Sequence, residues 1–259
     1  MKYKMVCVDL DGTLLDDNKE VTTNTINKIN EIVNQGALFV VTTGRPFTST
    51  KRYTDLICGN NPVVLYNGGV IRLSKSNEVL YNKALDSTDA KRIIDLINDN
   101  NGTFIYWRSE TPYVNKIDDY IRGYVRISKV EPLIHNNDYN NITKIIWFNE
   151  PKRNEEIKKT LDNKFDNVNF FTSDPRFLEF VSKGVSKGEA VKKLAKFYNI
   201  HQDEIMAIGD GDNDLSMIRY AGVGIAMENA SSDVKKYAND LTSSNDEEGV
   251  LKIINKYFK

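Results

Sequence analysis

The sequence predicts an α/β protein in which a parallel β-sheet is flanked by helices and a second, α+β module is inserted into the chain. Strand-like and helix-like segments alternate along the first third and again along the last quarter. This alternation is typical of parallel sheets, because each parallel strand is reached by a crossover that is usually helical. Residues 82–184 between them differ in character and contain both tryptophans.

The first third contains three apolar segments of strand length. Residues 3–9 are mostly apolar and end in an acidic residue, while 37–43 and 62–66 are continuous apolar runs, as expected of strands that are buried on both faces. Residues 23–35 form a predicted helix that Gly36 ends. Four apolar residues share one face of this helix: Ile26, Ile29, Ile32 and Val33.

The last quarter resumes the same pattern. Ser186 and Glu189 match the S-x-x-E capping box, which predicts the start of a helix. The elements expected after it are strands at 205–209 and 223–227, a helix around Val234, a short strand near Leu241 and a final helix over 249–258. Within the inserted module we expect helices at 88–99 and 154–165 and strands at 103–107, 143–148 and 177–182. The cap aromatics Tyr106, Trp107, Trp147 and Phe148 are predicted to be core residues.

Composition excludes several classes of protein. The 35 Lys and Arg residues balance 36 Asp and Glu residues, and the net charge is −1. The chain therefore has no excess of positive charge that would indicate binding to nucleic acid or to an anionic membrane. No apolar run approaches the roughly 20 residues of a transmembrane helix. The opening segment reaches Asp9 too early for a secretory signal, and two cysteines cannot form a disulfide framework. We therefore expect a cytoplasmic protein.

Polar residues follow the first predicted strand. Asp9 and Asp11 lie two residues apart and Gly12 comes next. Two carboxylates this close repel each other and need a cation or a shared proton. A simple Asp-Gly turn with an aspartate cap is the alternative interpretation.

Two further segments could bind an anion. Thr42-Thr43-Gly44-Arg45 follows the second strand, and a hydroxyl with a glycine amide can hold a phosphate oxygen. The same residues would also suit an ordinary helix cap. Lys187 lies at a helix start, where the helix dipole disfavours a cation unless an anion is close. A solvated surface lysine is the alternative.

Residues 209–214 follow the strand at 205–209 and contain three aspartates and one asparagine within five positions. Such hard oxygen ligands suit Mg²⁺. An EF-hand is excluded, because Leu215 stands where that loop needs Gly and Ala221 where it needs Glu. A polar loop with a helix cap is the alternative. All four segments lie on one predicted edge of one sheet, where α/β proteins bind ligands.

With these motifs the chain resembles the haloacid dehalogenase-like phosphohydrolases, and within them the Cof-like phosphatases with a large α/β cap. The matching segments are DLDGTL (9–14), TTGR (42–45), SKG (186–188) and GDGDND (209–214), in the order and spacing of the family. YNGG (66–69) is similar to a segment that these proteins carry just before the cap. The resemblance implies a Rossmannoid catalytic core at 1–81 and 185–259 and a cap at 82–184 that sets substrate specificity.

The resemblance also implies roles for residues of the motifs. Asp9 would be the nucleophile that forms an aspartyl-phosphate, and Asp11 the general acid and then the general base. Mg²⁺ would be held by Asp9, Asp11, Asp210 and Asp214. Phosphate would be bound by Leu10, Thr43, Gly44, Lys187 and Asn213. Arg45 would touch the substrate or the cap. Asp11 must then carry a proton while Asp9 stays ionised, which two nearby carboxylates in different surroundings can achieve, since proximity to Mg²⁺ keeps the pKa of Asp9 low.

The expected activity is therefore Mg²⁺-dependent hydrolysis of small phosphorylated metabolites: sugar phosphates, with nucleotide or cofactor phosphates as further candidates. A phosphomutase or phosphotransferase on the same scaffold and a non-catalytic phospho-ligand binder are the alternatives. Gly184 to Gly188 also matches G-x-S-x-G, but His201 follows the serine too closely for an α/β-hydrolase triad. We expect a monomer, with a dimer as the alternative.

Overall fold

The computed structural model describes residues 2–161 and 164–258 and divides into two compact units. The first unit consists of Met1–Arg45, Thr50–Tyr81 and Ser186–Lys259. The second consists of Pro46–Ser49 and Asn82–Val185. Because Asn82–Val185 of the second unit comes between Thr50–Tyr81 and Ser186–Lys259 of the first, the first unit is completed only by the C-terminal quarter of the chain.

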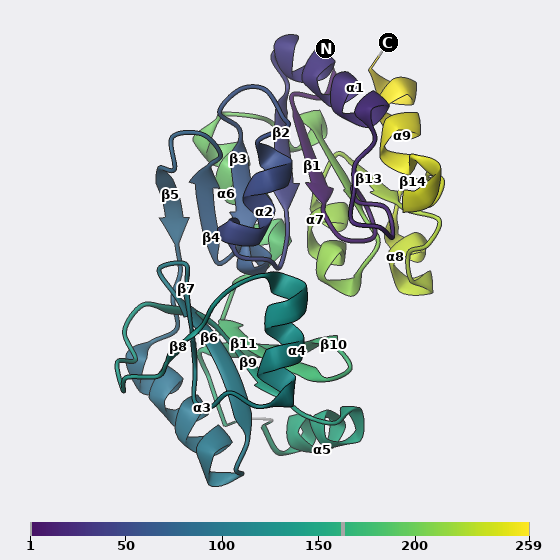
Figure 1. The fold of residues 1–259 in the computed structure, drawn as a ribbon. Helices are drawn as coiled ribbons and strands as arrows, with labels where there is room; N and C mark the ends of the chain where they lie inside the picture. Colours follow the sequence, from purple (N-terminus) through teal and green to yellow (C-terminus); the bar gives the residue numbers. More distant parts are fainter. Residues whose placement is uncertain (1, 162–163, 259) are drawn as a thin grey trace. The chain divides into compact units, whose positions relative to one another are not determined.

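The first unit is built on a sheet with the strand order β14-β13-β12-β1-β2-β3-β4-β5 in the described part of the chain (Figure 1). Its strands are β1 (Met5–Asp9), β2 (Leu38–Thr42), β3 (Pro62–Leu65), β4 (Val70–Leu73), β5 (Val79–Asn82), β12 (Ile205–Gly209), β13 (Val223–Ala226) and β14 (Asp240–Leu241). The central strand β1 pairs in parallel with β2 on one side and β12 on the other. The carboxyl ends of three strands therefore meet at one edge of the sheet.

The prediction of a parallel sheet needs one correction, because β4 pairs antiparallel to β3. The two strands are joined by a single short 3₁₀ turn, Tyr66–Gly68. A parallel partner would require a crossover of about a dozen residues or more. The sheet is therefore mixed.

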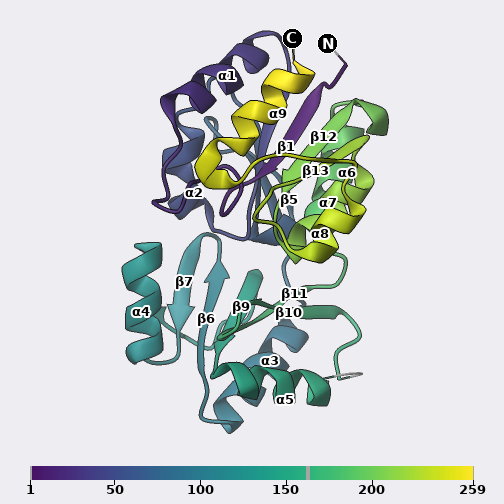
Figure 2. The same cartoon turned by 90° about the vertical axis from the view of Figure 1, so that its right-hand side faces the viewer.

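Helices cover both faces of this sheet. They are α1 (Thr23–Asn34), α2 (Phe47–Thr54), α6 (Lys187–Phe197), α7 (Leu215–Tyr220), α8 (Ser232–Tyr237) and α9 (Gly249–Tyr257). Figures 1 and 2 show α1 and α9 on one face and α6 and α7 on the other. On the α6 side, Ala190, Val191 and Leu194 pack with strand residues Met5, Cys7, Val40 and Ala207. The strands are thus buried on both faces, as their continuous apolar runs predict.

The start of α6 has the predicted cap. The Ser186 hydroxyl accepts a hydrogen bond from the backbone N–H of Glu189 at 3.1 Å. This bond satisfies one of the free N–H groups of the first turn. It also fixes Lys187 as the first residue of the helix.

The second unit has its own sheet, with the order β10-β11-β9-β6-β7-β8. Its strands are β6 (Thr103–Arg108), β7 (Thr111–Val114), β8 (Leu133–Ile134), β9 (Ile142–Phe148), β10 (Val168–Asp174) and β11 (Phe177–Ser182). Its helices are α3 (Ser87–Asp99), α4 (Asp119–Ser128) and α5 (Pro151–Leu161). Figure 2 shows α3 and α5 on one face of the sheet and α4 on the other.

The cap aromatics are core residues, as predicted. Tyr106 and Trp147 belong to the apolar cluster that α3 and α5 cover. Trp107 and Phe148 point to the opposite face, where the ring of Tyr124 from α4 packs edge-on against each of them. All four side chains are buried. Within the described residues, no helix is both long enough and apolar enough to cross a membrane.

Candidate active site

The site begins where β1 ends. Asp9 is the last residue of β1 and lies in register with Thr42, the last residue of β2. On the other side of β1, β12 ends at Gly209. The parallel pairing therefore brings together three of the four motifs, although they are far apart in the sequence.

Lys187 brings in the fourth motif. Its side chain is fully buried, and its Nζ donates hydrogen bonds to Oδ1 of Asp9 and, at 2.5 Å, to Oδ1 of Asp214. Burial acts to lower the pKa of Lys187, but the two carboxylates outweigh it and the pKa is raised. A buried lysine with two anionic partners stays charged, so the alternative of a solvated surface lysine is wrong.

The acidic residues around Lys187 carry more negative charge than one lysine neutralises. Burial, and then the charge of Asp214, raise the pKa of Asp9 well above its ordinary value, against the opposing effect of Lys187. Burial is also the main cause that raises the pKa of Asp210 to about 6. Raised carboxyl pKa values mean that these groups would gain free energy from a further cation nearby.

Asp9, Asp210 and Asp214 form a group whose ligand atoms all lie within 4.8 Å of one another. Oxygen donors at this spacing fit a hard divalent cation. Asp214 is firmly held, because its Oδ2 accepts hydrogen bonds from the backbone N–H groups of Asp210 and Gly211, each at 3.0 Å. Asp210 is held through its Oδ1, which accepts from the Thr13 hydroxyl at 2.7 Å. The residues present therefore suit a divalent metal ion.

Gly12 leaves room for the carboxylate of Asp210 within the acidic group. Its φ is +76°, a conformation that residues with a side chain rarely adopt. A Cβ atom at this position would lie 2.6 Å from Oδ2 of Asp210. Any other residue would therefore displace the Asp210 carboxylate.

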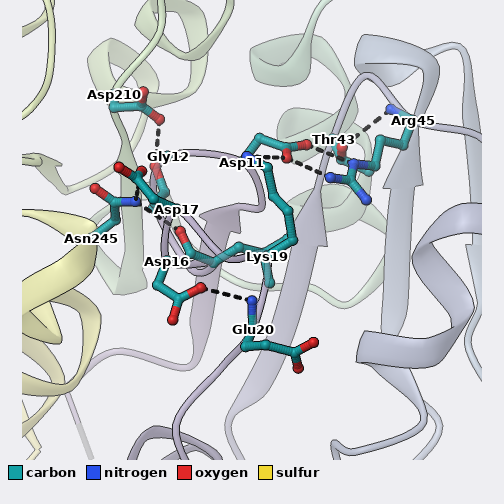
Figure 3. Close-up of polar contacts among 12 residues, drawn as sticks. Asp11, Gly12, Asp16, Asp17, Lys19, Glu20, Thr43, Arg45, Asp210 and Asn245 are labelled. Carbon is teal, nitrogen blue, oxygen red and sulfur yellow. Dashed lines mark hydrogen bonds and ion pairs between the residues drawn. The ribbon is translucent and has the colours of Figure 1, made fainter. Parts of the chain in front are cut away.

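The side chain of Asp11 lies outside the acidic group and contacts Arg45 instead (Figure 3). The Arg45 guanidinium donates from Nε to Oδ2 of Asp11 at 2.6 Å and from Nη2 to Oδ1 at 2.5 Å. Lys19 Nζ lies 3.3 Å from the same Oδ1. Burial acts to raise the pKa of Asp11, but the hydrogen bonds and charges of Arg45 and Lys19 prevail and lower it.

The expectation that Asp11 holds a proton while Asp9 is ionised concerns the site with Mg²⁺ bound; the protein groups alone shift the two pKa values in the opposite directions. The physical reason is the bidentate contact with Arg45, which stabilises the Asp11 carboxylate. Arg45 was predicted to touch the substrate or the cap. Its pairing with Asp11 was missed, because a single sequence carries no signal for a contact across 34 positions.

The other predicted phosphate-binding residues lie in the segments that follow β1, β2 and β12. The Thr43 hydroxyl accepts a hydrogen bond from the backbone N–H of Arg45 at 3.1 Å. Leu10 is fully buried, and its carbonyl accepts from the N–H of Leu15 at 2.9 Å. Asn213 is exposed, and its Nδ2 donates to Oδ1 of Asn67 at 3.0 Å.

Two residues of the site had no assigned role in the sequence analysis. Asn67 contacts both Asn213 and the glycine of the TTGR segment, Gly44. Its sequence signal is the segment YNGG at 66–69, which is similar to a segment of the family. Thr13, which holds Asp210, belongs to the DLDGTL motif and was not singled out there.

Comparison with known proteins decides the family. The family model described as haloacid dehalogenase-like hydrolase matches residues 6–254. The chain belongs to this family. Its fold and its motifs place it with the Cof-like members, and it is a phosphatase of this type, which hydrolyses small phosphorylated molecules.

Individual relatives cover the full length of this haloacid dehalogenase-like enzyme. A Bacillus subtilis protein named "Putative phosphatase YxeH" is 33% identical over 98% of both chains. The crystal structure of a haloacid dehalogenase-like hydrolase from Bacteroides thetaiotaomicron matches with a TM-score of 0.90 at 28% identity, over 99% of this chain and 100% of the other. The protein TM0651 from Thermotoga maritima matches with a TM-score of 0.88 at 32% identity, over 98% and 97%.

Proposed function

We propose that this phosphatase works through a covalent intermediate on Asp9. A carboxylate oxygen of Asp9 attacks phosphorus, the ester P–O bond breaks, and Asp11 gives a proton to the leaving alcohol. Asp11 then takes a proton from water, whose oxygen attacks the aspartyl-phosphate and releases inorganic phosphate and free Asp9. The observation that supports this most is the burial of Asp9 against Lys187 at the carboxyl ends of the strands. Two easier steps then replace one difficult step.

The role of Asp11 sets a condition on Arg45. The bidentate contact stabilises the carboxylate form of Asp11, whereas an acid has to hold a proton. Asp11 therefore has to leave Arg45 before the first step. We propose that Arg45 stabilises the ionised form of Asp11 when no substrate is bound. Once Asp11 has moved away, Arg45 contacts the substrate.

The remaining site residues would neutralise and orient the phosphate. Lys187, the Thr43 hydroxyl, the backbone amides of Leu10 and Gly44, and Asn213 would hold its oxygens. Asp9, Asp210 and Asp214 with the backbone carbonyl of Asp11 would hold Mg²⁺, which supplies positive charge to offset the repulsion between a carboxylate and a phosphate ester. The acidic group described above supports this assignment.

For the substrate we propose phosphorylated sugars or sugar alcohols, with nucleotide and cofactor phosphates as further candidates. One relative, from Bacillus subtilis, is named 5-amino-6-(5-phospho-D-ribitylamino)uracil phosphatase YitU and is 25% identical over 99% of this chain. It supports a class of substrate and not one compound. The inserted residues 82–184 would act as the cap that selects the leaving group. Action as a monomer in the cytoplasm stays a prediction.

The test is release of inorganic phosphate from p-nitrophenyl phosphate and from a panel of sugar, nucleotide and cofactor phosphates. We expect release by the wild type that requires Mg²⁺ and is abolished in Asp9→Asn. Asp212→Asn is the matched control, because Asp212 lies in the same loop as Asp210 but is exposed and outside the acidic group. Release that persisted in Asp9→Asn would contradict the mechanism. Substrate loss without stoichiometric free phosphate would favour a phosphotransferase.

A further inference from the structure

The turn between β3 and β4 has an unusual backbone. Tyr66, Asn67 and Gly68 follow one another with φ of +51°, +57° and +106°. Left-handed conformations are uncommon for residues with a side chain, and they are most costly for bulky ones such as tyrosine. Such strain persists only where the surroundings hold the backbone in place, and it occurs often at functional sites.

Two parts of the active site hold this turn. The backbone N–H of Asn67 donates to the carbonyl of Thr43 at 3.0 Å, which fixes the turn to the loop after β2. At Gly68 a Cβ atom would lie 2.3 Å from the carbonyl oxygen of Ser186, so the turn also packs directly against the cap of α6. The turn thus lies between the segment that carries Gly44 and the helix start that carries Lys187.

The side chain of Asn67 lies within this arrangement. It is 5% exposed, and its Oδ1 accepts a hydrogen bond from Nδ2 of Asn213 at 3.0 Å. Its carboxamide lies so close to Gly44 that a Cβ atom there would be 3.1 Å from Oδ1 and 3.2 Å from Nδ2. Asn67 therefore contacts two of the groups that are proposed to bind phosphate, and those groups come from different motifs.

We propose that Asn67 is a positioning residue that holds the Asn213 carboxamide, against the Gly44 loop, in the orientation that binds the phosphoryl group. This inference rests on the proposed function. Asn213 is exposed and Asn67 is buried, so the hydrogen bond joins an exposed side chain to one that its surroundings enclose. A side chain that is oriented before the ligand arrives loses less entropy on binding.

The chemistry of the asparagine side chain suits this role. Asparagine tolerates the left-handed conformation better than most residues, and its amide oxygen accepts the hydrogen bond without adding charge. An aspartate would add a negative charge next to groups that are proposed to bind phosphate, and this charge would repel a phosphate. Glycine would keep the backbone but would leave Asn213 without its acceptor.

A purely structural role predicts a different result from a positioning role. If Asn67 only forms the turn, Asn67→Gly should bind phosphate as the wild type does, because glycine adopts a φ of +57° without strain. If Asn67 acts through Asn213, the same variant should weaken phosphate binding while its melting temperature stays close to that of the wild type.

The experiment is a double-mutant cycle on the full-length protein with Asn67→Gly, Asn213→Ala and the double variant. The main measurement is the Kd for inorganic phosphate in the presence of Mg²⁺, by titration calorimetry, with kcat and KM for phosphate release beside it. We expect each single variant to weaken phosphate binding by roughly tenfold, the effect of losing one hydrogen bond to a charged ligand. We expect the double variant to be no weaker than Asn213→Ala alone, because residues that act through one another are not additive.

Asn77→Gly is the matched control, because Asn77 has a φ of +62° in the same unit but is exposed. It should bind phosphate as the wild type does. Wild-type affinity in Asn67→Gly, or multiplied losses in the double variant, would overturn the inference. If Asn67→Gly binds normally while Asp9→Asn has lost all phosphate release, only the inference fails. If the wild type binds phosphate but releases none from any ester, the proposed function fails. The phosphate Kd values of the double-mutant cycle then still test the role of Asn67.

Discussion

Replacement of Lys187 by methionine tests whether the buried ion pairs hold the site together. Methionine is similar in length but carries no charge, so Asp9 and Asp214 would remain buried without their shared partner. Removal of one partner from a buried ion pair costs about 3–5 kcal/mol of unfolding free energy. For domains of 150–250 residues each kcal/mol shifts the melting temperature by roughly 2–4 °C. We therefore expect a fall of about 6–20 °C.

The assay is thermal unfolding by differential scanning fluorimetry with and without Mg²⁺. Mg²⁺ should raise the melting temperature of Lys187→Met more than that of the wild type, because the variant has lost the only cation found among these acids in the described part of the chain. Lys192→Met is the control, since Lys192 lies on the same helix but is half-exposed and forms its ion pair with Glu189 at the surface. Exposed pairs contribute little, so its melting temperature should stay within about 2 °C of the wild type.

A second substitution shows whether the loss of stability in Lys187→Met comes from the unpaired charge of Asp9 or from altered packing. In Asp9→Asn with Lys187→Met, the side chain at position 9 no longer carries an unpaired charge. The loss of stability should then be smaller than the sum of the two single losses, because residues in direct contact are coupled. A melting temperature of Lys187→Met within 2 °C of the wild type would refute the reasoning, because it would mean that the buried lysine offsets no unfavourable charge.

Three further predictions concern other parts of the molecule. Gly12→Ala should lower stability by about 1–3 kcal/mol, and it should weaken Mg²⁺ binding in a calorimetric titration, because the left-handed backbone and the contact with Asp210 both oppose a Cβ atom. In the second unit, burial lowers the pKa of His135. As the pH falls below about 6.5, the unfolded chain therefore takes up a proton before the folded chain does, and unfolding is favoured. We expect the free energy of unfolding of the wild type, relative to that of His135→Phe, to fall between pH 7.5 and pH 5, as measured by urea unfolding. Lys144 and Glu179 form a buried ion pair with Nζ and Oε2 3.2 Å apart; Lys144→Met alone should lower stability by about 3–5 kcal/mol, whereas Lys144→Met with Glu179→Leu should lose much less.

The sheet of the first unit could be predicted largely because its strands are continuous apolar runs. β1, β2 and β12 are buried on both faces, and this condition leaves a strong and simple pattern in the sequence. Asn67-Gly68-Gly69 was interpreted as a tight turn, but the antiparallel strand β4 after it was not predicted, because the alternation of strands and helices indicated a parallel sheet. A short connection such as Tyr66–Gly68 is itself the signal for an antiparallel neighbour.

The second unit was predicted less well. β7 contains Pro112, a residue that is unfavourable in strands, and β8 has only two residues. α4 contains Gly123, which weakens the helical signal of its segment, and it was missed. α5 begins at Pro151 and not at residue 154, since proline fits the first turn of a helix.

The site could be predicted residue by residue but not contact by contact. The motifs contain Lys187, Asp210 and Asp214, whose side chains lie beside Asp9, and the strand order brings the motifs together. The contact of Arg45 with Asp11 and that of Asn67 with Asn213 could not be predicted, because each joins residues of different motifs through loop geometry. Local pattern specifies where a segment ends, while the direction of a long side chain depends on its neighbours in space.

The strand order also has a consequence for synthesis of the chain. β1 lies at the centre of its sheet, but its partner β12 begins at Ile205. At a translation rate of 5–20 residues per second, about 10–40 s pass between the two strands leaving the ribosome. During this interval one edge of the apolar strand Met5–Asp9 has no native partner and could pair with another chain. A chaperone that binds exposed strand edges would therefore be needed most while the second unit is being made.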